Sequence, residues 1–159
     1  MAKIVEVTQE YENTANPKSG CLIYGQGYQR TTHKHEIAIA VWLNTVFGGE
    51  VLLLKENAQH YGLKTPDYLW RDATWELKSV SSNKYDTIDK RIRKACEQIR
   101  ENAVWKKRGG VILDFTGNRL SMEKIRSYVI TSSEVRAHGV IDIIIKKGNE
   151  YIVLRTQKE

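Results

Sequence analysis

Two strand-like segments in direct succession, residues 67–72 (DYLWRD) and 73–80 (ATWELKSV), constrain the fold of this chain more than any other feature. Both are rich in aromatic and β-branched residues, and they meet at the Arg71-Asp72 pair, so they predict neighbouring strands joined by a tight turn. The rest of the chain must supply the other strands of the sheet and the helices that cover it.

Helical and strand-like patterns alternate through the rest of the chain. Apolar residues recur at helical spacing over residues 32–49, where Thr32 can cap the start and Gly48-Gly49 the end, and again over residues 86–103. The other expected elements, in chain order, are a short strand over 3–8, an irregular arm over 9–31, a buried strand over 50–54, a polar loop over 55–65, a buried strand over 111–115, a helix from Ser121 to Thr131, and a terminal hairpin over 139–157 that turns at Gly148-Asn149.

This order of elements predicts an α/β fold with a mixed central sheet flanked by helices. We expect one domain over residues 1–159, which consists of an N-terminal arm (1–31), a core (33–115) and a C-terminal helix and β-hairpin (116–159).

Charge is unevenly distributed. The chain has 25 Lys and Arg against 19 Asp and Glu, a formal net charge of +6, which is consistent with a polyanionic partner. Many cations fall in one stretch: Lys84, Lys90, Arg91, Arg93, Lys94, Arg100, Lys106, Lys107 and Arg108. A solvated helix face explains such a stretch by itself. The alternative is a phosphate-binding surface, for which the candidate nucleic-acid-binding residues are Lys84, Lys90, Arg91 and Lys94.

The sequence also indicates a compartment. No apolar run reaches the length of a membrane span, and the N-terminal residues lack the hydrophobic region of a signal peptide. The two cysteines, Cys21 and Cys96, give neither a disulfide framework nor a zinc spacing, and Cys96 falls on an apolar helical stripe that predicts a buried thiol. We therefore expect a cytoplasmic protein without a membrane partner.

Asp67, Glu76 and Lys78 are unusual residues for strands of this kind. Glu76 and Lys78 are two residues apart, so they point to the same face, opposite to Trp75 and Leu77. Asp67 lies on the neighbouring strand and can sit beside Glu76. Two carboxylates on one face repel each other unless a cation lies between them, and oxygen ligands suit a hard ion such as Mg²⁺ or Mn²⁺. Such an ion serves phosphodiester cleavage, in which a neighbouring lysine can orient the nucleophile or stabilise the transition state.

The same residues carry a resemblance to a known group of enzymes. Pro66, Asp67, Glu76, Leu77 and Lys78 match the pattern of the PD-(D/E)xK nuclease superfamily, and the order of elements matches its restriction-endonuclease-like core. The longer pattern LKTPDYLW…WELKSV…IDKRIRKACEQI…GGVILDF resembles the C-terminal nuclease domains of contact-dependent growth inhibition toxins. It is also similar to domains at the ends of phage minor head proteins.

The resemblance covers about residues 33–155 and implies a function and further site residues. The implied function is a tRNA-cleaving toxin that acts in a target bacterial cytoplasm and is neutralised by a cognate immunity protein. Glu36 is then a carboxylate of the active site, and Gln98 a polar residue of the helix that follows the motif. An exposed helix glutamate and a solvated glutamine are the alternatives for these two residues.

Other polar and aromatic residues leave their roles open. His33 and His35 do not form a known zinc spacing and are expected on the surface or against phosphate. Asp114 and Asp142 fall in strands, where they are either buried partners or edge residues. Trp70 is either a core residue or a base-stacking platform.

The sequence thus predicts a metal-dependent nuclease, a hydrolase acting on RNA in preference to DNA. Asp67 and Glu76 are the expected metal ligands, and the catalytic set is Glu36, Asp67, Glu76, Lys78 and Gln98. The alternatives are a DNA endonuclease of the same superfamily, or an inactive nucleic-acid-binding or phage structural module.

Overall fold

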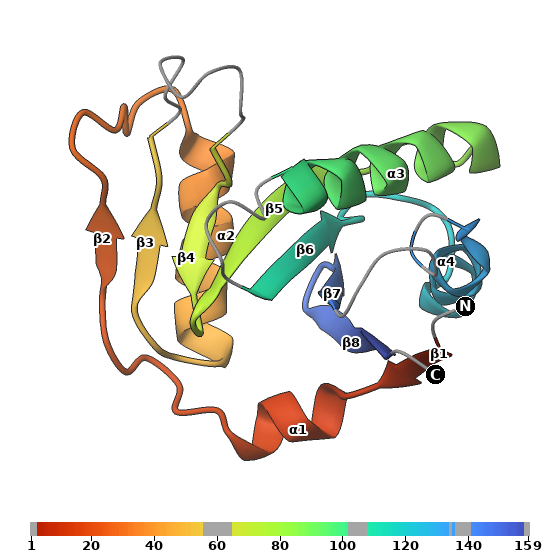
Figure 1. The fold of residues 1–159 in the computed structure, drawn as a ribbon, viewed down its shortest axis with the longest axis horizontal. Coiled ribbons are helices and arrows are strands. Elements are labelled where there is room, and N and C mark those ends of the chain that lie inside the picture. Colours follow the sequence, from red (N-terminus) through yellow and green to blue (C-terminus); the bar gives the residue numbers. More distant parts are fainter. Residues whose placement is uncertain (1–2, 56–64, 102–107, 134, 136–140, 158–159) are drawn as a thin grey trace.

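A single sheet of eight strands, ordered β1-β8-β7-β6-β5-β4-β3-β2, organises the protein (Figure 1). The structure is a computed structural model that describes residues 3–55, 65–101, 108–133, 135 and 141–157. The strands are β1 (Lys3–Glu6), β2 (Leu22–Tyr24), β3 (Val51–Leu53), β4 (Tyr68–Trp70), β5 (Ala73–Ser79), β6 (Arg108–Asp114), β7 (Ile141–Lys147) and β8 (Glu150–Gln157). The helices are α1 (Thr8–Asn13), α2 (Lys34–Val46), α3 (Tyr85–Glu101) and α4 (Met122–Thr131).

The sheet mixes parallel and antiparallel pairs. Strands β5, β6 and β7 are parallel neighbours at its centre, and β2 pairs parallel to β3. The β3–β4, β4–β5, β7–β8 and β1–β8 pairs are antiparallel. Central parallel strands are covered on both faces and are therefore apolar along their whole length, as in Val111–Leu113 and Ile143–Ile145, all at most 1% exposed.

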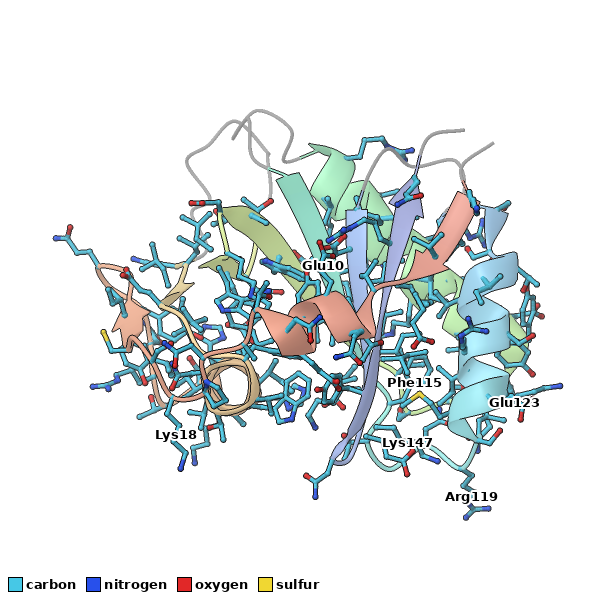
Figure 2. The ribbon with its side chains drawn as sticks, turned by 90° about the horizontal axis from the view of Figure 1, so that it is seen from below. Glu10, Lys18, Phe115, Arg119, Glu123 and Lys147 are labelled. Carbon is cyan, nitrogen blue, oxygen red and sulfur yellow. The ribbon has the colours of Figure 1, made fainter. Side chains whose placement is uncertain are left out.

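Helices cover both faces of the sheet. Val111 and Leu113 of β6 pack in a core with α3 and α4, whereas Ile112 packs on the other face with residues of α2 and with Tyr11 of α1. This alternation along one strand follows from the two-residue period of β-structure. In a view from below, Phe115 lies beside α4, while Arg119 and Glu123 project outward (Figure 2). The predicted α/β fold, a mixed central sheet flanked by helices, is confirmed.

Local signals placed several boundaries correctly. The tight turn between β4 and β5 uses Arg71 (φ 52°) and Asp72 (φ 54°), both left-handed, as a two-residue hairpin turn requires. Ser121 caps α4, because its hydroxyl accepts a hydrogen bond from the Lys124 N–H at 3.2 Å. The terminal hairpin turns at Gly148, as predicted. Cys96 is buried, 1% exposed, as predicted.

Two expectations for the first third of the chain are wrong. The stretch 9–31 is not wholly irregular, because it contains most of α1 and all of β2, and β2 forms an edge of the sheet. A strand of only three residues is too short for its alternation to stand out, and its pairing with β3 supplies the order. Thr32 does not cap α2: its hydroxyl donates to the Gln29 carbonyl, and His33 occupies the cap position without a side-chain hydrogen bond.

The expected polar loop over 55–65 falls largely outside the described residues, as do His60, Trp105, Lys106, Lys107 and His138. No helix of the described part of the chain combines the length and the apolar composition that crossing a membrane requires.

Candidate active site

The predicted carboxylates Asp67 and Glu76 come together where β4 begins. Asp67 precedes β4 and stands opposite Glu76, because the Asp67 N–H donates to the carbonyl of Trp75 at 3.0 Å. The Asp67 carboxylate in turn accepts a hydrogen bond from the Leu77 N–H at 2.7 Å, which fixes it against β5. Glu76 is 5% exposed and pairs along the sheet with Val111, so its side chain points to the face that α3 covers.

Lys78 lies on the same face as Glu76. Its Nζ is 3.8 Å from Glu76 Oε1, and the two side chains are 17% and 7% exposed. A fixed cation beside a buried carboxylate favours the ionised carboxylate. The structure therefore brings together the Asp67, Glu76 and Lys78 side chains that the sequence pattern singled out.

Burial dominates the electrostatics of the carboxylate pair. Burial and, after it, the charge on Asp67 together raise the pKa of Glu76 to about 9, while Lys78 opposes the shift. Burial also raises the pKa of Asp67 to about 7, against the lowering effect of the Leu77 N–H. The charge on Glu36 raises the pKa of both groups. In the absence of a metal ion, burial and mutual repulsion therefore favour a proton on this pair at neutral pH.

Glu36 approaches this pair from the first turn of α2. The Tyr28 hydroxyl donates to Glu36 Oε2 at 2.7 Å, and His33 Nδ1 is 3.7 Å from Oε1. The Tyr68 hydroxyl donates to the Glu36 backbone carbonyl at 2.7 Å, which ties the start of α2 to β4. Glu36 is therefore not a freely solvated helix residue, since Tyr28 binds its carboxylate and Tyr68 binds its backbone carbonyl.

Sequence reasoning missed Tyr28 and Tyr68. Burial raises the pKa of the Tyr28 phenol, and the hydrogen bond to Glu36 and the charges of Glu36 and Asp67 add to this shift. Tyr28 therefore lies within electrostatic reach of both carboxylates. The pattern YGQGYQ indicated only a turn, and no local signal distinguishes Tyr28 from an ordinary loop tyrosine.

A second polar cluster fastens α2 to the ends of β5 and β6. His35 Nε2 is 2.9 Å from the Ser79 hydroxyl and 3.3 Å from Asp114 Oδ2. Asp114 is 5% exposed and also accepts hydrogen bonds from Thr116, so it is a buried partner. The same imidazole nitrogen faces both Ser79 and Asp114, whereas a nucleophilic triad requires opposite ring nitrogens. The cluster is therefore a structural contact and not a serine-based catalytic site.

Gln98 lies on one flank of α3. Lys84, Arg91 and Gln98 are spaced by seven residues, about two helical turns, and so form a line along the helix axis. The opposite flank of α3 faces α4, where the rings of Tyr85 and Tyr128 are 4.9 Å apart. The line of Lys84, Arg91 and Gln98 therefore looks away from α4.

The predicted nucleic-acid-binding cations are exposed on α3 or, in the case of Lys84, directly before it. Lys84, Lys90, Arg91 and Lys94 are exposed, while the neighbouring Arg93 pairs with Asp89 at 3.1 Å. The stretch is thus an exposed basic surface on α3 and directly before it. Exposure alone fits both a solvated face and a phosphate-binding face.

The oxygen atoms of the Asp67–Glu76 pair are suitable ligands for a hard divalent cation, because one of them is buried without a hydrogen-bond donor from the residues that the structure describes. Glu76 Oε2 is a buried oxygen to which no group in the described residues donates a hydrogen bond, and the same holds for Gln98 Oε1. An ion between Asp67 and Glu76 would satisfy that oxygen and relieve the repulsion between the two groups. Within the described part of the chain, no group of three or more His, Cys, Asp or Glu is arranged to hold a metal, so the fit rests on this pair.

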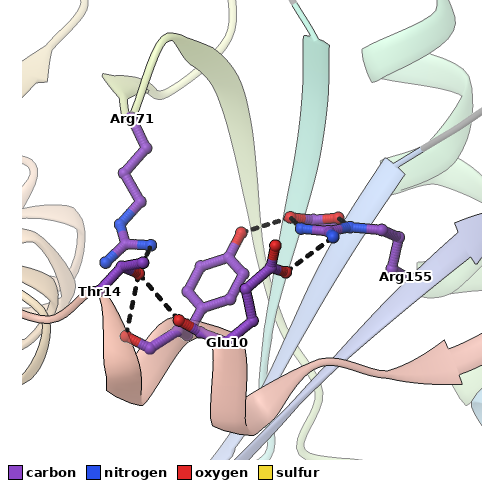
Figure 3. A network of polar contacts seen from close by, with 6 residues as sticks. Glu10, Thr14, Arg71 and Arg155 are labelled. Carbon is purple, nitrogen blue, oxygen red and sulfur yellow. Dashed lines mark hydrogen bonds and ion pairs between the residues drawn. The ribbon is translucent and has the colours of Figure 1, made fainter.

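A separate polar network lies around the start of β7, where Asp142 is the second residue of the strand (Figure 3). Arg155 binds Asp142 through two hydrogen bonds of 2.7 and 3.0 Å and pairs with Glu10 at 2.7 Å, and the Tyr11 hydroxyl donates to Asp142. The network borders a cavity of about 490 Å³, lined also by Arg71. Asp142 is 3% exposed and therefore a buried partner, which joins α1 to β7 and β8.

Trp70 belongs to the core and not to a stacking surface. It is 2% exposed, and its indole N–H donates to the Gly48 carbonyl at 3.0 Å. A nucleobase has no access to a ring buried in this way.

Comparison with known proteins shows a shared fold. No model of a known protein family matches the chain, and no curated protein sequence matches it. Among solved structures, a chain of the CdiA-CT/CdiI toxin and immunity complex from Burkholderia pseudomallei superimposes with a TM-score of 0.56. The match covers 86% of this chain and 99% of that one at 15% sequence identity.

Proposed function

We propose that this protein is a toxin-type effector that hydrolyses phosphodiester bonds with the help of a divalent metal ion, and that its substrate is RNA, with tRNA favoured. The observation that carries the proposal is the buried Asp67–Glu76 pair with Lys78 beside it and Glu36 within electrostatic reach. The structural similarity to a chain of a toxin and immunity complex supports the toxin part of the proposal.

Each member of the site has a role that follows from its position. Asp67 and Glu76 would hold Mg²⁺ or Mn²⁺, which when bound polarises a phosphoryl oxygen and lowers the pKa of a coordinated water. Lys78 supplies a positive charge on the same face, where it can orient the nucleophile or stabilise charge that develops on the phosphate. Glu36, held by the Tyr28 hydroxyl, is an auxiliary carboxylate that can accept a proton or add a ligand oxygen.

The α3 surface completes the proposed site. Lys84, Lys90, Arg91 and Lys94 would contact phosphates without regard to sequence. Gln98 follows Lys84 and Arg91 along the flank of α3 that points away from α4, and its amide would contact the substrate backbone.

A cleavage assay tests this function. We expect the protein to degrade total RNA in the presence of Mg²⁺ or Mn²⁺ and to lose this activity in EDTA. Cleavage of plasmid DNA and not of RNA would identify a DNA endonuclease of the same chemistry. Binding of nucleic acid with no cleavage under any condition would identify an inactive binding module.

A metal titration tests the ligand assignment independently of activity. Asp67→Asn keeps the size of the side chain and removes its charge, so Mn²⁺ binding measured by calorimetry should weaken strongly while the fold persists. Glu150→Gln changes an exposed carboxylate far along the chain and provides the matched control. Equal Mn²⁺ affinity in the wild type and Asp67→Asn would remove Asp67 from the metal site.

A cognate immunity protein is part of the same proposal. The structurally similar chain was solved in a complex of toxin and immunity protein. Expression of this chain in bacteria should therefore inhibit growth, and Lys78→Met should relieve that inhibition. Co-expression of a neutralising partner should restore growth with the wild-type site intact.

A further inference from the structure

A row of aromatic rings leads from the candidate active site to the edge of the sheet. The ring centroids of Tyr24 and Tyr28 are 5.8 Å apart, and those of Tyr28 and His33 are 5.2 Å apart. Tyr28, in the middle of the row, donates a hydrogen bond to Glu36, and His33 at one end lies 3.7 Å from the same carboxylate. Tyr24 ends β2, the outermost strand, at the other. We refer to Tyr24, Tyr28 and His33 as the aromatic row.

The aromatic row is more accessible than the aromatic residues of the core. Tyr24, Tyr28 and His33 are each half-buried, with Tyr24 and Tyr28 packed against the α2-side core by one part of the ring. Phe47 and Trp75, in contrast, are each 1% exposed. Part of the surface of each of these three rings therefore remains outside the hydrophobic core and accessible.

Cations accompany the aromatic row. The guanidinium carbon of Arg30 lies 3.9 Å from the ring centroid of Tyr24. The Lys55 amine lies 2.9 Å from the position that a Cβ atom on Gly27 would take, and the φ of 79° at Gly27 shapes the turn that leads to Tyr28. Rings interleaved with Arg and Lys are characteristic of surfaces that bind single-stranded nucleic acid, because bases stack on the rings and phosphates meet the cations.

We propose that the aromatic row binds an unpaired base of the substrate next to the phosphate that is cleaved. This inference rests on the proposed nuclease function and narrows its substrate to nucleic acid with unpaired nucleotides, such as a loop or a single strand. A base inside a duplex is stacked on both faces, so it reaches such a ring only after it leaves the stack.

The position of Arg30 is compatible with this role. Its guanidinium carbon lies over one face of the Tyr24 ring, and bases stack on guanidinium planes as well as on aromatic rings. A bound base either stacks on Arg30 or takes its place, and in both arrangements the Arg30 charge stays close to a neighbouring phosphate.

Stacking can be measured without cleavage. The full chain is titrated in EDTA with a short RNA that carries 2-aminopurine, whose fluorescence falls when it stacks, either as a single strand or annealed to its complement. We expect quenching with the single strand and little with the duplex. Tyr24→Leu keeps apolar bulk but removes the ring, and it should weaken single-strand binding about 5- to 150-fold, the range of one base–aromatic stack.

Control variants separate the ring from other effects. Tyr24→Phe keeps the ring and should bind like the wild type. His33→Ala removes a ring at a helix start where the imidazole makes no capping bond, so it should fold normally and weaken binding in the same direction. Thermal unfolding of each variant verifies its folding.

The outcomes decide the proposal separately from the nuclease function. If Tyr24→Leu and His33→Ala bind and quench as the wild type does, the aromatic row is not a base-binding site, even if RNA is cleaved in Mg²⁺. Equal quenching by duplex and single strand would also overturn the proposal. Ring-dependent quenching without cleavage at any metal concentration would retain the base-binding site and reject the nuclease. Absence of any nucleic-acid binding would reject both.

Discussion

Replacement of Glu76 by Gln should change how the stability of the protein depends on pH. Burial raises the pKa of Glu76 to about 9, from an ordinary value of 4.5. The native state therefore keeps a proton on Glu76 at pH values where the unfolded chain has released it. Stability is full below the unfolded pKa and falls as the pH rises toward the folded pKa.

The structure sets the size of this effect. For each pH unit over which a group is protonated in the native state and ionised in the unfolded chain, the free energy of unfolding falls by about 1.4 kcal/mol. Between pH 5 and pH 7 one such carboxyl costs about 2 to 3 kcal/mol, and the 5% exposure of Glu76 leaves little solvent to screen it. Glu76→Gln has no proton to release, so this part of the loss disappears.

Urea unfolding at pH 5, 6 and 7 in EDTA measures the effect. The free energy of unfolding of the wild type should fall by about 2 to 3 kcal/mol more than that of Glu76→Gln over this range. Glu150→Gln, which changes an exposed carboxylate, should follow the wild type. Excess Mn²⁺ at pH 7 should raise the stability of the wild type and not that of Glu76→Gln, because binding to the native state stabilises it.

Parallel curves for the wild type and Glu76→Gln would refute the reasoning. In that case Glu76 would have an ordinary pKa in the native state, and Asp67 and Glu76 would not form a buried pair in need of a cation. Stabilisation of both proteins by Mn²⁺ to the same extent would place the ion elsewhere.

Three further predictions concern single groups of the site and the core. Lys78→Met keeps most of the side-chain volume, so RNA affinity should change little while single-turnover cleavage falls about 100-fold or more; a folded variant that cleaves at the wild-type rate would exclude Lys78 from the site. Joint replacement of Arg91 and Lys94 by Ala should reduce the log–log salt dependence of RNA binding by about one unit per lost phosphate contact, and an unchanged slope would assign these cations to a solvated face. Gly110→Ala should lower the free energy of unfolding by about 1 to 3 kcal/mol in a denaturant titration, because a Cβ atom there would lie 2.4 Å from the Trp75 ring; unaltered stability would mean that this ring can shift freely.

Much of the central sheet could be predicted from local patterns. The hairpin of β4 and β5, the Ser121 cap of α4 and the turn at Gly148 all depend on residues within a few positions of one another. The shared face of Glu76 and Lys78 likewise follows from the two-residue period of one strand. Asp67 could be placed beside them because a two-residue turn leaves little freedom in the register of a hairpin.

The sequence by itself thus determined the class of fold and the grouping of Asp67, Glu76 and Lys78, since periodicity and turn chemistry act over short distances. Only the tertiary structure decided that β2 joins the sheet, because its parallel pairing with β3 links residues 22–24 with 51–53 and leaves no local pattern. That pairing and the turn after it bring Tyr28 to Glu36, and the approach of α2 to β6 brings His35 to Asp114. His35 and Asp114 lie far apart along the chain, and Tyr28 meets Glu36 only because the pairing of β2 positions the turn between them. These partners are therefore set by packing of the whole sheet and not by any spacing that can be read from one segment.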